Sequence, residues 1–154
     1  MEAFIAAMLV LGGSGHVPTE RVEKAGEAIW RIATEMDADP FLVAAVGWVE
    51  TRWKPDIRSK TRDCGILQVN LRYTKFTCKE LQVLDTGLRE GIAKLQGWKR
   101  RFGKREKKKM LWVCHYNGGN VCEKRSLGYG RSVYRTYRKL KRTAAKKERE
   151  KRDE

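Results

Sequence analysis

A nine-residue apolar run that ends in a single carboxylate is the feature that most constrains how this chain folds. Residues 41–49 read Phe-Leu-Val-Ala-Ala-Val-Gly-Trp-Val, and Glu50 follows directly. Asp39 and Pro40 precede the run, and this pair is typical of a helix N-cap followed by a proline in the first turn. The pattern therefore predicts a helix that opens at Pro40 and ends near Glu50.

Glu50 has two interpretations. A carboxylate held against valine and tryptophan side chains loses hydration, which raises its pKa toward the range where it donates a proton near neutrality. Such a group is suited to glycoside cleavage, because the departing oxygen needs a proton. Alternatively, Glu50 caps an exposed helix end and keeps its charge in water. The motifs that follow it favour the catalytic interpretation.

Apolar spacings predict a mostly helical protein. Residues 18–36 carry apolar side chains at intervals of three and four, and so do residues 85–103. Further helices are expected over 110–115 and about 130–142. With 154 residues, 41% of them hydrophobic, the chain is long enough for one domain with a real core and too short for two ordinary ones.

Four short motifs occur in order along the chain. They are Glu50-Thr51-Arg52-Trp53-Lys54-Pro55 with Ser59, then residues 63–70 (Asp-Cys-Gly-Ile-Leu-Gln-Val-Asn), residues 86–95, and Tyr116-Asn117-Gly118-Gly119 followed by Tyr129 and Val133. Together they resemble the lysozyme-like lytic transglycosylase (SLT domain) family over about residues 39–137. Three positions depart from the family pattern: Thr51 stands for Ser, Ile66-Leu67 for Leu-Met, and Gly87 for Asn.

The resemblance implies a fold and an activity. It implies a mostly α, lysozyme-like single domain with at most a small β-hairpin near the active site, within residues 56–70. It also implies cleavage of the β-1,4 bond between N-acetylmuramic acid and N-acetylglucosamine in peptidoglycan, with Glu50 as general acid and base. The products would be 1,6-anhydro sugars, and neither a metal nor an organic cofactor is expected.

The same resemblance implies the substrate contacts. Gln68, Tyr116 and Asn117 would position the sugar and polarise its acetamido group. Trp53 lies three residues past Glu50 among charged residues, so we expect it at the cleft as a stacking platform, and the other tryptophans in the core. The full set of predicted substrate-binding residues is Thr51, Trp53, Gln68, Asn70, Tyr116, Asn117 and Tyr129.

Asp63 leaves the type of product open. Residues 63–70 also resemble a segment of chicken-type lysozyme in which the aspartate is the second catalytic carboxylate, so Glu50 and Asp63 could form a hydrolytic muramidase. Asp63 could equally satisfy backbone N–H groups in a hairpin. The chicken-type match ends after Asn70, and the later Tyr116 motif favours the transglycosylase.

Four cysteines allow three pairings. Proximity in the sequence favours Cys64 with Cys78 and Cys114 with Cys122, and oxidised cysteines would indicate an exported protein. A zinc site from Cys114, His115 and Cys122 is disfavoured, because the chain has no C-x-x-C pair and only two histidines.

The net charge of +15 predicts an acidic polymer as a partner. Residues 99–109 hold eight Lys or Arg, and residues 143–154 form a basic tail without an apolar face that we expect to be flexible. Both segments would bind acidic wall polymers, and a secretion apparatus or a phage particle is a further candidate partner. The rival hypothesis is a basic nucleic-acid-binding protein, but no recognised motif supports specific nucleic-acid binding.

Residues 1–17 are apolar up to Leu11 and then rich in glycine. They are either a signal peptide, although Glu2 sits where a positive charge belongs, or a first helix on the domain. No run reaches the roughly 20 apolar residues of a membrane span. We therefore expect the transglycosylase domain over 18–142, in a protein exported to the periplasm, cell wall or medium, or associated with a virion.

Overall fold

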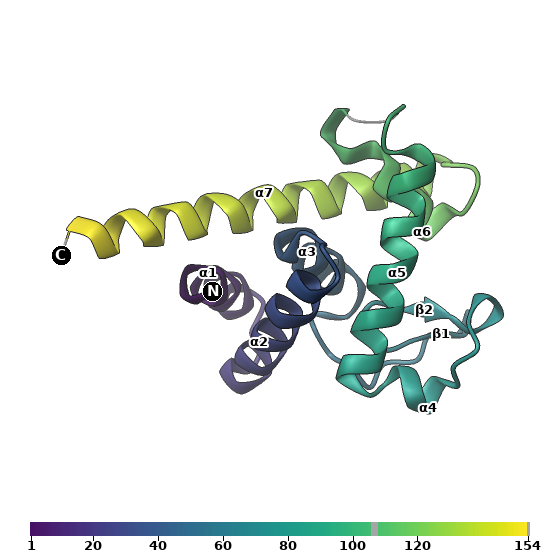
Figure 1. Ribbon diagram of the computed structural model, residues 1–154, viewed down its shortest axis with the longest axis horizontal. Coiled ribbons are helices and arrows are strands. Elements are labelled where there is room, and N and C mark those ends of the chain that lie inside the picture. The colour runs from purple at the N-terminus through teal and green to yellow at the C-terminus, as the bar shows by residue number, and fades with distance from the viewer. Residues whose placement is uncertain (106–107, 154) are drawn as a thin grey trace.

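The computed structural model describes residues 1–105 and 108–153. Its helices are α1 (Glu2–Ser14), α2 (Thr19–Glu35), α3 (Pro40–Thr51), α4 (Cys78–Leu81), α5 (Leu84–Phe102), α6 (Cys114–Gly118) and α7 (Lys124–Asp153), with 3₁₀ turns at Leu71–Tyr73 and Lys108–Val113. Strands β1 (Asp63–Cys64) and β2 (Val69–Asn70) pair antiparallel. Figure 1 shows α1, α2 and α3 on one side of the long helix α7, and α5 near its N-terminal end. The prediction of a mostly α fold with one small hairpin is confirmed.

Helix α3 forms the centre of the core. The side chain of Asp39 accepts a hydrogen bond from the Phe41 backbone N–H at 2.9 Å, and Pro40 occupies the first turn, as the sequence predicts. Residues 42–48 are all buried, and α3 packs against both α2 and α7. Because α3 is enclosed along this length, its last turn carries Glu50 to the edge of the core.

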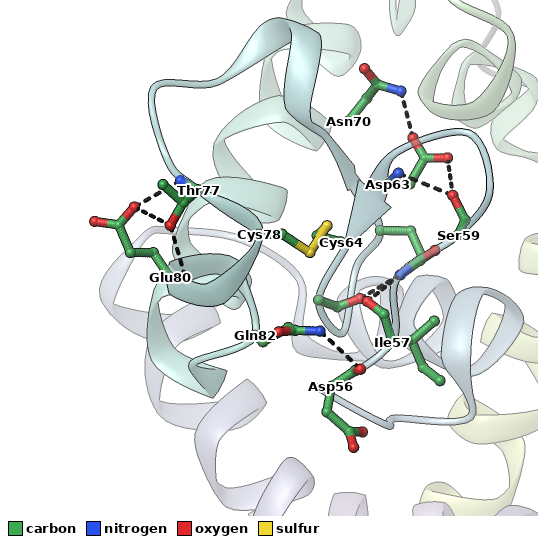
Figure 2. The surroundings of a disulfide bond; sticks show 12 residues. Asp56, Ile57, Ser59, Asp63, Cys64, Asn70, Thr77, Cys78, Glu80 and Gln82 are labelled. Carbon is green, nitrogen blue, oxygen red and sulfur yellow. Dashed lines mark hydrogen bonds between the residues drawn. A yellow bond between two sulfur atoms is a disulfide. The ribbon is translucent and has the colours of Figure 1, made fainter.

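Two disulfides fix the chain around the hairpin and after α6. Cys64 on β1 is bonded to Cys78 at the start of α4, as Figure 2 shows, and Cys114 is bonded to Cys122. Both pairings agree with the prediction. Because Cys114 and Cys122 are joined to each other, neither offers a free thiolate beside His115 for a metal ion.

Both ends of the chain contribute to the core. Phe4, Ala7, Met8 and Leu11 of α1 are buried, and α1 packs against α2 and α7. Helix α7 continues to Asp153 rather than ending near residue 142, because Ala144 is buried against the core and the following turns carry ion pairs of lysine with glutamate. The flexibility that we expected of the tail stays a prediction.

The helix predicted over residues 110–115 is wrong in its bounds. A 3₁₀ turn covers Lys108–Val113 and α6 follows it, because Lys109 and Met110 adopt left-handed φ values of 52° and 53° that interrupt an α-helix. Residues 106 and 107 of the basic segment and residue 154 of the tail lie outside the described residues. Within the described ranges, none of the helices is long and apolar enough to cross a membrane.

The packing of α1 generates a stability prediction. The Phe4 ring is 1% exposed and lies 5.2 Å from the Trp30 ring and 5.1 Å from the Phe41 ring, between centroids. Phe4→Ala should therefore lower the free energy of unfolding by about 3–5 kcal/mol, through lost burial and the cavity left behind. Denaturant unfolding with intact disulfides measures this, and Val10→Ala, at an exposed position of α1, should change stability by less than about 0.5 kcal/mol. Equal midpoints for the two variants would contradict the packing of α1.

Candidate active site

A cleft of about 600 Å³ lies between the hairpin region and the chain that follows α6. Glu50 and Asp63 both line it. A second cavity of about 220 Å³ shares part of the same wall and continues to Tyr73 and Trp98. The shared residues are Asp63, Gln68, Asn70, Tyr116 and Asn117. Together the two cavities form an elongated groove with the carboxylates in its wall.

Glu50 stands in the last turn of α3 and is largely removed from water. The Tyr129 hydroxyl, on α7, donates a hydrogen bond to Oε1 of Glu50 at 2.7 Å. Burial raises the pKa of Glu50 to about 7, and the negative charge of Asp63 acts in the same direction, while the Tyr129 hydrogen bond opposes both. Near neutral pH the group is therefore present in both protonated and ionised forms, which suits an acid that later acts as a base.

Two tyrosines, Tyr129 and Tyr116, lie near this carboxyl group. Burial, followed by the charge of Glu50, raises the pKa of Tyr129 and of Tyr116 well above the ordinary phenol value. The Tyr116 hydroxyl donates to the Leu67 carbonyl oxygen at 2.8 Å, which ties α6 to the turn before β2. Both predicted tyrosines thus lie at Glu50 or in the adjoining cleft wall.

Asp63 has a different environment in the same cleft. Its Oδ2 accepts hydrogen bonds from Ser59 Oγ at 2.8 Å and Thr61 Oγ1 at 2.5 Å, and its Oδ1 accepts one from Asn70 Nδ2 at 2.7 Å. Figure 2 shows Ser59 and Asn70 reaching Asp63 from two sides. Hydrogen bonds to a charged acceptor are short and orienting, so these three donors hold the carboxylate in one position.

The turn between the strands places Gln68 in the cleft wall. Gly65 adopts a φ of 81°, and a Cβ there would lie 2.2 Å from the Leu81 carbonyl oxygen, so only glycine fits. Gln68 also has a positive φ, 50°, and its Nε2 donates to the carbonyl oxygens of Gly65 and Ile57 at 2.9 and 3.3 Å. Because the amide nitrogen is used inside the turn, Oε1 of Gln68 is left as an acceptor for a ligand.

Thr51 and Trp53 do not occupy the positions predicted for them. The Trp53 side chain is 0% exposed, and its Nε1–H donates to the Ala44 carbonyl oxygen at 2.8 Å, so the prediction of a stacking platform is wrong. The reason is a sharp reversal, in which Arg52 and Trp53 both take left-handed φ values and turn Trp53 under α3. The Thr51 hydroxyl donates to the Ile66 carbonyl oxygen at 2.9 Å and does not line the cleft, so it positions the turn.

Several residues of the cleft were not predicted as site residues. Ser59 and Thr61 orient Asp63, and only Ser59 carried a signal, through its place in the first motif. Arg125 also lines the cleft and is exposed. It lies in a basic stretch that carried no separate signal. Asn117 lies in the wall as predicted, and its exposed side-chain amide has no partner among the described residues.

Comparison with known families accounts for this arrangement. Residues 27–138 match the transglycosylase SLT domain, which covers more than half of the chain. The protein belongs to this family. Searches of curated proteins and of solved structures found no match. Membership confirms the resemblance seen in the four motifs, and it makes the chain a peptidoglycan-cleaving enzyme with a lysozyme-like fold.

The raised pKa of Glu50 predicts a pH-dependent stability in this SLT domain. The folded protein binds the Glu50 proton more tightly than the unfolded chain, so this contribution to stability is full below pH 4.5 and is lost as the pH rises through about 7. Glu50→Gln removes the ionisation. The unfolding free energy of the variant relative to wild type should thus increase from pH 4 to pH 8, by on the order of 3 kcal/mol.

Urea unfolding at both pH values measures this difference. Glu20→Gln, at an exposed position on α2, is the control and should show no comparable change. A Glu50→Gln variant whose relative stability is the same at pH 4 and pH 8 would contradict the burial of the charged group.

Proposed function

We propose that this protein is a lytic transglycosylase that cleaves the bond between N-acetylmuramic acid and N-acetylglucosamine in peptidoglycan and releases 1,6-anhydro products. The observation that carries the proposal is the environment of Glu50. A buried carboxyl group with a pKa of about 7, beside an open cleft, is able to give a proton and take one back at the same pH.

The reaction needs one acid and one base at different times. Protonated Glu50 gives its proton to the glycosidic oxygen, the C1–O bond breaks, and positive charge develops on the muramic acid ring. The N-acetyl carbonyl oxygen of the same sugar then stabilises C1. The Glu50 carboxylate next removes the proton from the 6-hydroxyl, whose oxygen bonds to C1. No water is consumed, and Glu50 is protonated again at the end.

The cleft wall would stabilise the developing charge and hold the sugar. Asp63, oriented by its three hydrogen bonds, supplies a fixed negative charge in the cleft that also contains Glu50. Oε1 of Gln68, the Tyr116 hydroxyl oxygen and the free amide of Asn117 are available to the acetamido group. In this proposal Asp63 acts electrostatically, because its three donors hold the carboxylate in one position.

The length of the groove supports a polymeric substrate. The second cavity continues the cleft past Asn70 to Tyr73, whose side chain is 67% exposed. A groove that extends beyond the carboxylates has room for sugars on either side of the cleaved bond. We propose that it binds peptidoglycan glycan strands, that the basic segments hold the enzyme on acidic wall polymers, and that the protein acts after export or as part of a phage particle.

Product analysis tests the reaction type. Purified peptidoglycan treated with the wild type should release muropeptides with 1,6-anhydro ends, lighter by one water than reducing ends in mass spectrometry. Glu50→Gln should lower the rate by about 10³-fold, because the substituted side chain gives no proton. Reducing ends in place of anhydro ends would make the enzyme a hydrolytic muramidase. No release by folded wild-type protein on several wall types would contradict both activities.

The role of Asp63 is tested separately. Asp63→Asn keeps the shape of the side chain and one oxygen, with two acceptor positions at most, but it removes the negative charge. We expect the rate to fall roughly tenfold to hundredfold while the products stay 1,6-anhydro sugars. Asp56→Asn, at an exposed aspartate outside the cleft, is the matched control and should keep the wild-type rate. A loss as large as that of Glu50→Gln would assign Asp63 a covalent or acid–base role.

A further inference from the structure

The solvent-facing side of α7 carries an ordered row of arginines. Six of the seven arginines of this helix lie within about 60° of one line along it, taking about 100° of rotation per residue. All six are exposed. We call this row the arginine line, and its members are Arg131, Arg135, Arg138, Arg142, Arg149 and Arg152.

The line is opposite the buried side of the helix. Ser126, Gly130, Val133, Leu140 and Ala144 are the buried residues of α7, and they fall on the other half of the same rotation. In Figure 1 α1 and α3 lie along one side of α7, and its other side is not covered by another element over most of its length. None of the six arginines forms an ion pair with an acidic residue in the described part of the chain.

Arginine and lysine are separated on this helix. Four of its six lysines lie off the line, namely Lys139, Lys141, Lys147 and Lys151. Three of these are engaged locally: Lys147 with Glu150, Lys151 with Glu2, and Lys141 over the Phe41 ring. The local contacts of the arginines are with neutral groups, Arg135 with Ser132 and Arg138 over the Tyr134 ring. A face that served only to carry net charge would not need this separation. Guanidinium groups bind phosphate oxygens through two parallel hydrogen bonds, whereas an ammonium group acts as a point charge.

The geometry of the line fits a linear partner. From Arg131 to Arg152 the helix rises roughly 32 Å, and with Lys146, which pairs with Glu150, a cation occurs about every 5 Å. The line begins two residues after Tyr129, so its first arginine lies at the end of α7 that donates a hydrogen bond to Glu50, on the opposite side of the helix from Tyr129. A linear polyanion with regularly spaced charges therefore complements this surface in shape and sign.

We propose that the arginine line binds a phosphodiester polymer of the cell wall, of the teichoic-acid type, and so holds the enzyme beside its glycan substrate. This proposal rests on the proposed function for its choice of a wall polymer rather than nucleic acid, which has the same phosphodiester chemistry. It deepens that function by assigning the partner to one face of one helix.

The test compares three variants in the full chain, each with Glu50→Gln so that the wall is not degraded. The first replaces Arg135, Arg138, Arg142 and Arg149 by glutamine, and the second replaces the same four by lysine. The third replaces the four off-line lysines by glutamine and so removes the same charge as the first. Binding is measured on sacculi that carry teichoic acid and on the same sacculi stripped of it with hydrofluoric acid.

The parent should bind the teichoic-acid sacculi at least about tenfold more tightly than the stripped ones, and the arginine-to-glutamine variant should lose this difference. For the arginine-to-glutamine variant, the slope of log K against log salt concentration should fall in magnitude by about 3. For the off-line lysine variant, this slope should change by less than about 1. The arginine-to-lysine variant should bind the teichoic-acid sacculi about threefold more weakly, or weaker still, because lysine keeps the charge but does not form the paired hydrogen bonds of arginine.

Three results would overturn the proposal. Equal losses for the arginine and off-line lysine variants would mean that net charge alone binds, and equal binding to both kinds of sacculi would exclude the phosphodiester polymer. Duplex DNA that displaces the protein at lower phosphate concentration than soluble polyglycerol phosphate would assign the line to nucleic acid. Cleavage of stripped sacculi by chains with Glu50 intact tests the proposed function independently, and all three sets of substitutions should leave that rate unchanged.

Discussion

The removal of one carboxyl group from water is the constraint on which the rest of the structure depends. Glu50 is held at the end of α3, and α3 is fixed because residues 42–48 are enclosed by the surrounding helices. Burial raises the pKa of this group, and a single donor, Tyr129, offsets part of that effect. The resulting pKa of about 7 reflects burial and the charge of Asp63 on one side and the Tyr129 hydrogen bond on the other, so it depends on the distance between α3 and α7.

The two carboxylates of the cleft illustrate how a fold separates roles. Glu50 receives one donor and little water, whereas Asp63 receives three donors, two from the loop before β1 and one from β2, and the Cys64–Cys78 disulfide ties β1 to α4. The turn of the hairpin is also fixed against the end of α4, because Gly65 lies against the Leu81 carbonyl oxygen with no room for a side chain. A carboxyl group changes protonation state near neutral pH only where the interactions that favour its neutral form and those that favour its charged form nearly cancel. A group that stays charged needs interactions that favour the charged form. Adjacent elements provide both.

Local rules explain which parts of this structure could be predicted from the sequence. The cap at Asp39, the helix that follows it and both disulfides depend on residues close in the chain, and they were predicted correctly. The small hairpin was expected from the family resemblance instead. Trp53 was misplaced because two successive non-glycine residues take left-handed φ values, and no glycine marks such a reversal. Ser59 and Thr61, two of the donors to Asp63, were missed because their role appears only once the loop closes.

The length of α7 was underestimated for a different reason. Beyond residue 142 the sequence has no continuous apolar face. In the structure, however, Ala144 is buried in the core, and α1 packs against α7. Arginines three and four residues apart repel each other, which destabilises a helix by about 0.2–0.5 kcal/mol per pair. Packing on α1 and α3 therefore has to maintain this helix against its own charge. Because the same helix supplies Tyr129 to Glu50, the packing that maintains α7 also sets the position of the hydrogen bond to this carboxyl group.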